Sequence, residues 1–262
     1  MKQQYFWSSN LARFVVTFFL PMIFFAHLDY AQGEASATAT GKQRGPGAIV
    51  DDPVASQPVS SPPKSNDNKA LRFQVSYVYR AGGEGAMKTL KSGATLHSGD
   101  HYKIQFTSEQ DAYVYIFQID SSGAVYQLYP MRDFKGVVVN SSNPVKAGVS
   151  YYVPSAHQSF ELDRQTGTEK LYFLAFAQSN PTFETIAEQL WNAQKTNNAL
   201  LATATATDFA GEVNLRGPVK IVADPAKRVQ VSWSANEIFE MPLQRLDDLC
   251  ATCVNTIEFI HK

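Results

Sequence analysis

Two places in the chain combine residue types and spacings that could do chemistry, and the first is a pair of histidines. His97 and His101 flank a Ser-Gly-Asp turn that contains Asp100. Two histidine nitrogens and a carboxylate can bind zinc. The turn lies between two expected strands, however, so a spacing of four residues does not place both histidines on one helix face. We therefore expect solvated turn residues here and no metal site.

The second place is the pair Cys250 and Cys253. This spacing serves redox exchange when the first cysteine begins a helix, and it serves zinc when further Cys or His ligands are near. Neither context is visible, and no histidine directly follows Cys253, which excludes attachment of a c-type haem. A disulfide between the two cysteines is the state that we expect in an exported chain. A free pair and a redox-active pair are the alternatives.

No other motif predicts catalysis or a cofactor. The sequence has no G-x-S-x-G nucleophile elbow and no D-x-D-x-D-G calcium loop. The Gly-rich segment 81–86 is followed by neither a helical pattern nor Gly-Lys-Ser/Thr, which favours a strand connection over a phosphate-binding loop. We interpret Asp247 and Asp248 as a polar turn before the cysteines. We therefore expect no catalytic residue, no cofactor and no enzyme activity.

Composition and charge narrow the function classes. The 262 residues carry a net charge of −1, and 44% of them are hydrophobic. This supplies one full-sized core, or one core with tails. A charge so near zero gives no basis for binding nucleic acid or an anionic membrane surface. With 12 Tyr, 17 Phe and 3 Trp, the chain favours a β-rich core over the alternative of a ligand-stacking surface.

Residues 1–31 have the pattern of an export signal. Lys2 and Arg13 supply positive charge, the uncharged apolar run 14–26 follows them, and small residues come next. The run is short for a membrane span, which needs roughly 20 residues, and Pro21 interrupts it. We expect a cleaved signal and a mature chain without a transmembrane domain. An uncleaved anchor is the alternative.

The next region, residues 32–70, differs sharply in composition. It is rich in Pro, Ala, Ser and Thr and contains no Phe, Tyr or Trp. Without large apolar groups, such a segment cannot offset the entropy lost on ordering. We predict a disordered spacer here, followed by a single domain that spans residues 71–262.

From residue 71 onward the pattern is that of a β-protein. Strict alternation over 71–79 predicts a half-buried strand. The runs 112–119 and 169–177 are apolar on both faces, which predicts two central strands. Asp120 and Gly123 have the types expected in a tight hairpin turn after the first of these runs. Further strands are expected at residues 101–106, 124–130, 149–154, 157–163, 219–223, 229–233 and 255–261.

One helix is expected at residues 181–193, with Asn180 as its cap and Pro181 at its first position. Its apolar stripe should cover the outer face of a central strand. Residues 199–211 fit either a fading helix or a loop. Strands joined by turns, with a single helix, predict a mainly β fold. We expect an antiparallel β-sandwich, immunoglobulin-like or similar, with one packed helix.

The segment 96–130 also carries a family resemblance. Its pattern L-x-S-G-D-x-Y, followed by D-A-Y-V-Y-I-F-Q-I-D-S-S-G and L-Y-P, resembles the bacterial family of domains of unknown function numbered 4384. Gly167, Glu169 and the run 171–177 match a later segment of that family, and the resemblance spans residues 71–180. It implies an exported or envelope-associated bacterial protein. It transfers no catalytic residue, because the family has none assigned.

These observations predict a function class. The signal, the spacer and the missing active-site groups indicate an exported, non-catalytic β-sandwich module of the periplasm or cell envelope, or a secreted one. Its expected partner is another envelope or secreted protein, through protein–protein or cell-envelope contacts. The alternative is a carbohydrate- or peptidoglycan-binding module that uses exposed aromatic side chains.

Overall fold

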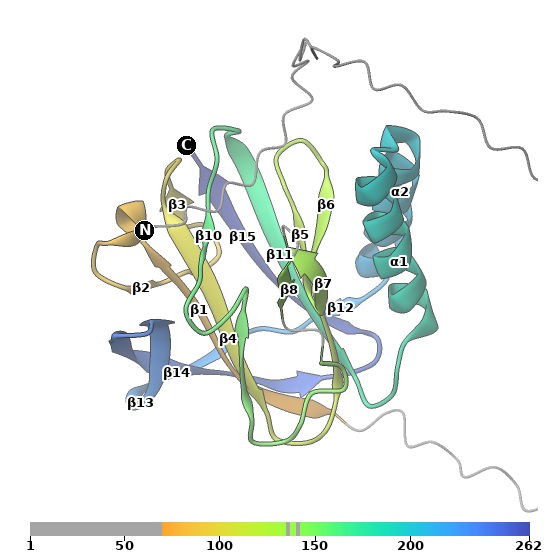
Figure 1. Cartoon of the computed structure of the whole chain (residues 1–262). Coiled ribbons are helices and arrows are strands. Elements are labelled where there is room, and N and C mark those ends of the chain that lie inside the picture. The colour runs from red at the N-terminus through yellow and green to blue at the C-terminus, as the bar shows by residue number, and fades with distance from the viewer. Residues whose placement is uncertain (1–69, 135–136, 140–141) are drawn as a thin grey trace, which may run out of the picture. The chain divides into compact units, whose positions relative to one another are not determined.

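The structure, a computed structural model, describes residues 70–134, 137–139 and 142–262. The predicted export signal and all but the last residue of the predicted spacer lie outside the described residues. Within the described part, two sheets pack face to face and a pair of helices covers one of them (Figure 1). The mainly β, sandwich-like fold is thereby confirmed.

The first sheet, called sheet A, has seven strands in the order β10-β4-β1-β14-β13, with β2 beside β1 and β9 beside β4. Every pair in it is antiparallel. Its strands are β1 (Leu71–Arg80), β2 (Lys88–Thr89), β4 (His101–Ser108), β9 (Ser150–Val153), β10 (Phe160–Glu161), β13 (Val222–Ser234) and β14 (Glu237–Leu249).

The second sheet, called sheet B, has six strands in the order β12-β15-β11-β5-β6, with β3 beside β15. The pairs of β15 with β12 and with β3 are parallel, and the others are antiparallel. Its strands are β3 (Thr95–Leu96), β5 (Tyr113–Ile119), β6 (Val125–Tyr129), β11 (Gly167–Phe176), β12 (Gly217–Pro218) and β15 (Cys253–His261). A short helix η1 (Ala81–Gly83) and the small hairpin of β7 (Met131–Phe134) and β8 (Val137–Val139) complete the β-rich part.

Alternation along the strands builds the core between the sheets. In β1 the side chains of Leu71, Phe73 and Val75 are buried, while Arg72 and Gln74 between them are exposed, as predicted. The Phe73 ring meets the Phe173 ring of β11 edge to face across the two sheets. This core therefore depends on strands from both halves of the chain.

The strands β5 and β11 are buried on both faces, which confirms their prediction as central strands. Val114 and Ile116 of β5 belong to the core between the sheets. Tyr115 and Phe117, on the opposite face of β5, pack in a second apolar cluster with Phe183 of the helix pair. The helices thus supply the outer cover that a strand without a polar face requires.

Two helices form this cover rather than the one helix that was expected. The first, α1 (Pro181–Thr196), begins at the predicted cap, where the Asn180 side chain accepts hydrogen bonds from the Thr182 and Phe183 N–H groups. It continues three residues beyond the predicted end, to Thr196. The second, α2 (Ala199–Asn214), resolves the segment left open between a helix and a loop.

The weak pattern of α2 has a physical reason. Its buried side chains, Thr205, Phe209 and Val213, recur every four residues and form a narrow stripe. Residues 202–207 alternate Ala and Thr, and this run shows no clear hydrophobic period of either a helix or a strand. The Thr203 and Thr207 hydroxyls donate to the carbonyl oxygens four residues earlier, which is how threonine is accommodated inside a helix.

The strand β14 was not predicted, and the interpretation of Asp247 and Asp248 as a turn was wrong. Both aspartates lie within β14, which pairs with β1 on one side and β13 on the other. Pro242 and the nearby charges obscured the strand pattern. Pro242 is tolerated because it pairs with Arg228 beside an irregularity in the β13 register.

The end of the β13–β14 hairpin that extends beyond β1 packs over the outer face of β1. Beyond its pairing with β1, β14 continues with β13 alone, and Val231 and Trp233 pack there against Val78 of β1. Lys103 of β4 fixes this arm: its Nζ donates to the carbonyl oxygens of Ser232 at 3.0 Å and Trp233 at 2.8 Å. The hairpin is thereby held against the strands that it crosses.

Candidate functional site

The histidines around the Ser-Gly-Asp turn make separate contacts. Asp100 Oδ2 accepts a hydrogen bond from the His97 backbone N–H at 2.8 Å, and its Oδ1 accepts one from the Gly82 N–H at 3.0 Å. His101 instead contacts Glu161 of β10 and Ser159, the residue just before β10. Within the described ranges, no group of three His, Cys, Asp or Glu side chains has a metal-binding arrangement. Asp100 therefore ties the turn to the Gly-rich segment.

His101 lies between a serine and a carboxylate, which are the groups of a serine hydrolase triad. Its Nδ1 is 2.9 Å from Ser159 Oγ, while its Nε2 is 3.7 Å from Glu161 Oε2. The second distance is too long for a hydrogen bond, so the carboxylate does not orient the imidazole as a triad requires. Burial lowers the pKa of His101, against the opposing charges of Glu161 and Asp100. These cross-strand neighbours give no support for catalysis.

A polar cluster lies between the two sheets, and its acceptor end is Glu169 of β11. The Tyr102 hydroxyl of β4 donates to Gln118 Oε1, and Gln118 Nε2 of β5 donates to Glu169 Oε2 at 2.8 Å. His261 of β15 places Nδ1 3.7 Å from Glu169 Oε1, and its Nε2 lies 3.2 Å from Ser98 Oγ. Glu169 and His261 are only 3% and 2% exposed.

The turn after β5 closes one side of this cluster. Asp120 Oδ1 accepts hydrogen bonds from the Ser122 and Ala124 N–H groups, and Gly123 has a φ of 83°, so the predicted turn roles of Asp120 and Gly123 are confirmed. Gly167 is required opposite this turn, because a Cβ there would lie 2.4 Å from Ser121 Cβ. The missing side chain lets β11 approach the turn closely.

The electrostatics of the cluster raise the proton affinity of its carboxyl group. Burial raises the pKa of Glu169 to about 7, with smaller contributions from the charges of Asp120 and Asp163, while the Gln118 hydrogen bond opposes the shift. Such a carboxyl has the proton affinity of a general acid or base. The cavity beside it, however, has a volume of only about 40 Å³, which is room for one to a few water molecules.

The raised pKa predicts a pH-dependent stability. An ordinary glutamate has a pKa of 4.5, so the folded state binds the Glu169 proton more tightly than the unfolded chain does. The resulting stabilisation is fully present below pH 4.5 and is lost as pH rises through about 7. We expect the stability of Glu169→Gln not to fall in this way as the pH rises. The amide is neutral like the protonated carboxyl, and it does not ionise. Urea unfolding between pH 5 and 8 measures this difference.

The control for this prediction is Glu258→Gln, which changes an exposed carboxyl that pairs with Lys170. His261, Tyr102, Tyr126, Asp120 and Asp163 also face the cavity and stay unchanged in both variants. Stability curves of wild type and Glu169→Gln that run parallel across the whole pH range would contradict the role assigned to Glu169.

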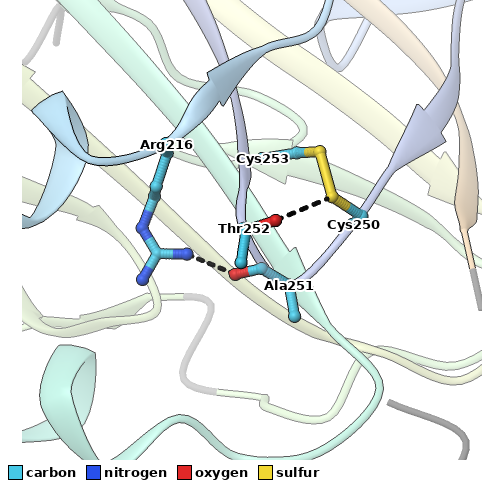
Figure 2. Close-up of a disulfide and its surroundings, with 5 residues drawn as sticks. All are labelled: Arg216, Cys250, Ala251, Thr252 and Cys253. Carbon is cyan, nitrogen blue, oxygen red and sulfur yellow. Dashed lines mark hydrogen bonds between the residues drawn. A yellow bond between two sulfur atoms is a disulfide. The ribbon is translucent and has the colours of Figure 1, made fainter. Parts of the chain in front are cut away.

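The cysteine pair forms a disulfide in the turn between β14 and β15 (Figure 2). The Cα atoms of Cys250 and Cys253 are 4.9 Å apart, and the Cys253 N–H donates to the Cys250 carbonyl oxygen at 2.9 Å. The turn is also fixed from outside, because the Gly217 N–H donates to the Thr252 carbonyl oxygen at 2.8 Å. The cysteines thus lie at a strand turn and not at the start of a helix, where thiolates are stabilised.

Arg216 connects this turn to the helix pair. Figure 2 shows its side chain reaching toward the turn, where Nη1 donates to the Ala251 carbonyl oxygen. The guanidinium carbon lies 4.8 Å from the ring centre of Phe183 in α1 and 5.3 Å from that of Phe176 in β11. Glu212 of α2 pairs with Nη2 at 3.4 Å. One side chain therefore joins both helices, sheet B and the disulfide turn.

Because the turn has these other contacts, we expect the disulfide to contribute modestly to stability. A loop as short as Cys250–Cys253 restricts the unfolded chain by at most about 2 kcal/mol. The double variant Cys250→Ser with Cys253→Ser should fold and lose no more than this in urea unfolding. Thiol titration of the wild type, native and unfolded, should find no free thiol. A variant that fails to fold would contradict the assignment.

A wide groove lies between the two helices. Its walls include Thr182, Thr185 and Gln189 of α1 and Thr207, Gly211 and Leu215 of α2. Its volume is about 770 Å³, and none of its lining residues is His, Cys or Lys. The groove could hold an extended or helical segment, and Asp208 and Glu212 are the two carboxylates among its lining residues.

Residues 95–179 match the family described as Domain of unknown function (DUF4384). This match agrees with the resemblance seen in the sequence and covers about a third of the chain. No curated protein and no solved structure matches the chain. The DUF4384 match begins at β3 and ends before α1, so it is narrower than the resemblance over residues 71–180.

The DUF4384 segment supplies only part of the sandwich. It contains the neighbouring strands β5, β6 and β11 of sheet B, but β15, which pairs with β11, lies outside it. The same division runs through the polar cluster, where Tyr102, Gln118 and Glu169 belong to the DUF4384 segment and His261 does not. The helix groove lies entirely outside the match.

Proposed function

We propose that this protein is an exported, non-catalytic module that contacts another protein of the cell envelope. The observation that carries the proposal is the α1–α2 groove, which is wide enough for a polypeptide segment and is lined by no His, Cys or Lys. The polar cluster supports the same conclusion, because its cavity is too small for a substrate larger than a few water molecules.

Export is supported by the pattern of residues 1–31 and by the disulfide, since disulfides persist mainly in oxidising compartments. Periplasm and cell envelope are the compartments that we propose. None of the helices in the described part is both long and apolar enough to cross a membrane.

Carbohydrate binding receives less support. Sugar-binding surfaces use aromatic rings that are open to solvent. Every Phe, Tyr and Trp side chain whose burial the structure describes is buried or half-buried. Most aromatic side chains in the described part pack in the core between the sheets or in the cluster beneath the helices.

A photo-crosslinking residue placed at Thr207 tests the proposal in envelope preparations. Thr207 lies in the groove, whereas Glu240, an exposed residue of β14, is the matched control position. We expect one discrete crosslinked product from position 207 and none from position 240. Equal labelling from both positions, or no product from position 207, would count against a protein-contact function at the helices.

A further inference from the structure

The outer side of α2 presents an apolar face that no described segment covers. Leu200 and Leu215 are 85% and 82% exposed, the highest values among the large apolar residues that the structure describes. Ala204, Thr207 and Gly211 are also exposed and lie between them at helical spacing. Large apolar side chains this exposed mark an interaction surface when they adjoin a groove.

The shape of this surface suits another helix. Small side chains at the centre of α2 let a partner backbone approach closely, and a Cβ at Gly211 would have no atom within 4 Å. The facing wall of α1 includes the side chains of Thr182, Thr185 and Gln189, together with Pro181 and Ile186. A helix that lays leucine-sized side chains into such a groove is a common mode of peptide recognition.

The negative charge of the groove indicates the charge of the partner that it would bind. Asp208 and Glu212 lie in the groove, and α2 itself contains no Lys or Arg. Arg216, just beyond α2, donates to Ala251 and pairs with Glu212 at 3.4 Å, so the negative charge of the groove rests mainly on Asp208. On α1, Glu188 is exposed and adds another negative charge. A second copy of this chain would bring the same acids together, so self-association through this face is disfavoured.

We propose that the α1–α2 groove binds an amphipathic, cationic helix of a partner protein. The leucine-type side chains of that helix would fill the groove between Leu200 and Leu215, and its Lys or Arg residues would face Asp208. This inference rests on the proposed function, to which it adds the chemical class of the partner.

Fluorescence anisotropy with two labelled helical peptides tests the proposal on the full chain. One peptide is built from leucine and lysine, and the other has glutamate in place of lysine. We expect the lysine peptide to bind and the glutamate peptide not to bind. Gly211→Trp, which fills the groove, and Asp208→Lys, which reverses its charge, should each weaken binding of the lysine peptide by about tenfold or more.

Gly211→Ala is the matched control, because it adds one methyl group to an open helix position and should bind like the wild type. Gly211→Leu replaces Gly211→Trp if the latter fails to unfold cooperatively in urea. Lysine-peptide binding that is absent, or unaffected by both groove variants, would overturn the inference, as would equal binding of the glutamate peptide. If a discrete crosslink from Thr207 persists in that case, the contact function stands and only the partner class is wrong.

Discussion

The Leu190→Asp variant is expected to show no cooperative unfolding transition. Leu190 is buried in the cluster that α1 forms with Tyr115, Phe117 and Leu174 of sheet B. A carboxylate at this position would be buried without a partner, which costs more than the loss of apolar contacts alone. Circular dichroism and urea unfolding measure the outcome.

Two companion variants make this result quantitative. Leu190→Ala removes only apolar contacts and should lose about 2–5 kcal/mol of unfolding free energy. Thr185→Asp introduces the same carboxylate at an exposed position of α1 and should leave stability nearly unchanged. A soluble Leu190→Asp protein with the melting curve of the wild type would show that α1 does not cover sheet B.

The Lys103→Met variant is expected to destabilise the protein by about 2–4 kcal/mol. Lys103 is fully buried, and its Nζ donates to three backbone carbonyl oxygens, those of Ala156 at 2.9 Å, Ser232 at 3.0 Å and Trp233 at 2.8 Å. Methionine has a similar length but no donor, so three backbone carbonyl oxygens would each lose the hydrogen bond from Lys103. Urea unfolding measures the loss of free energy.

Lys88→Met is the control, since Lys88 is an exposed lysine of β2 whose Nζ lies 5.9 Å from the centre of the Tyr79 ring. Exposed substitutions of this kind usually change stability by less than about 0.5 kcal/mol. If Lys103→Met and Lys88→Met unfold at the same urea concentration, the three carbonyl contacts of Lys103 do not hold the β13–β14 hairpin.

Local sequence patterns predict the elements whose neighbours impose a simple period. β1 alternates because one face meets the core, and most of β5 and the second half of β11 are apolar on both faces because helices cover the second face. The start of α1 was predictable from Asn180, whose side chain accepts from N–H groups of the first turn, and from Pro181, which has no N–H to satisfy. Each of these signals is contained within a few adjacent residues.

The features that sequence reasoning missed depend on distant contacts. β14 tolerates Pro242 because of an irregular register with β13, and no local pattern reveals that register. Glu169 and His261 become a cluster only because β11 and β15 are adjacent in sheet B. The groove was missed because one of its walls, α2, has too weak a period to be recognised as a helix.

The placement of β14 and β15 has a consequence for how fast the protein folds. Sheet A requires β1 to find β14, sheet B requires β11 to find β15, and Tyr77 donates a hydrogen bond to Asn255, which is 178 residues away along the chain. Contacts between such remote segments close long loops before they gain stability, and folding rates fall as the mean sequence separation of contacts grows. Until the last strands are synthesised, β1 and β11 each have an edge without its final neighbour. We therefore expect the chain to fold slowly, a property that suits the export that we propose.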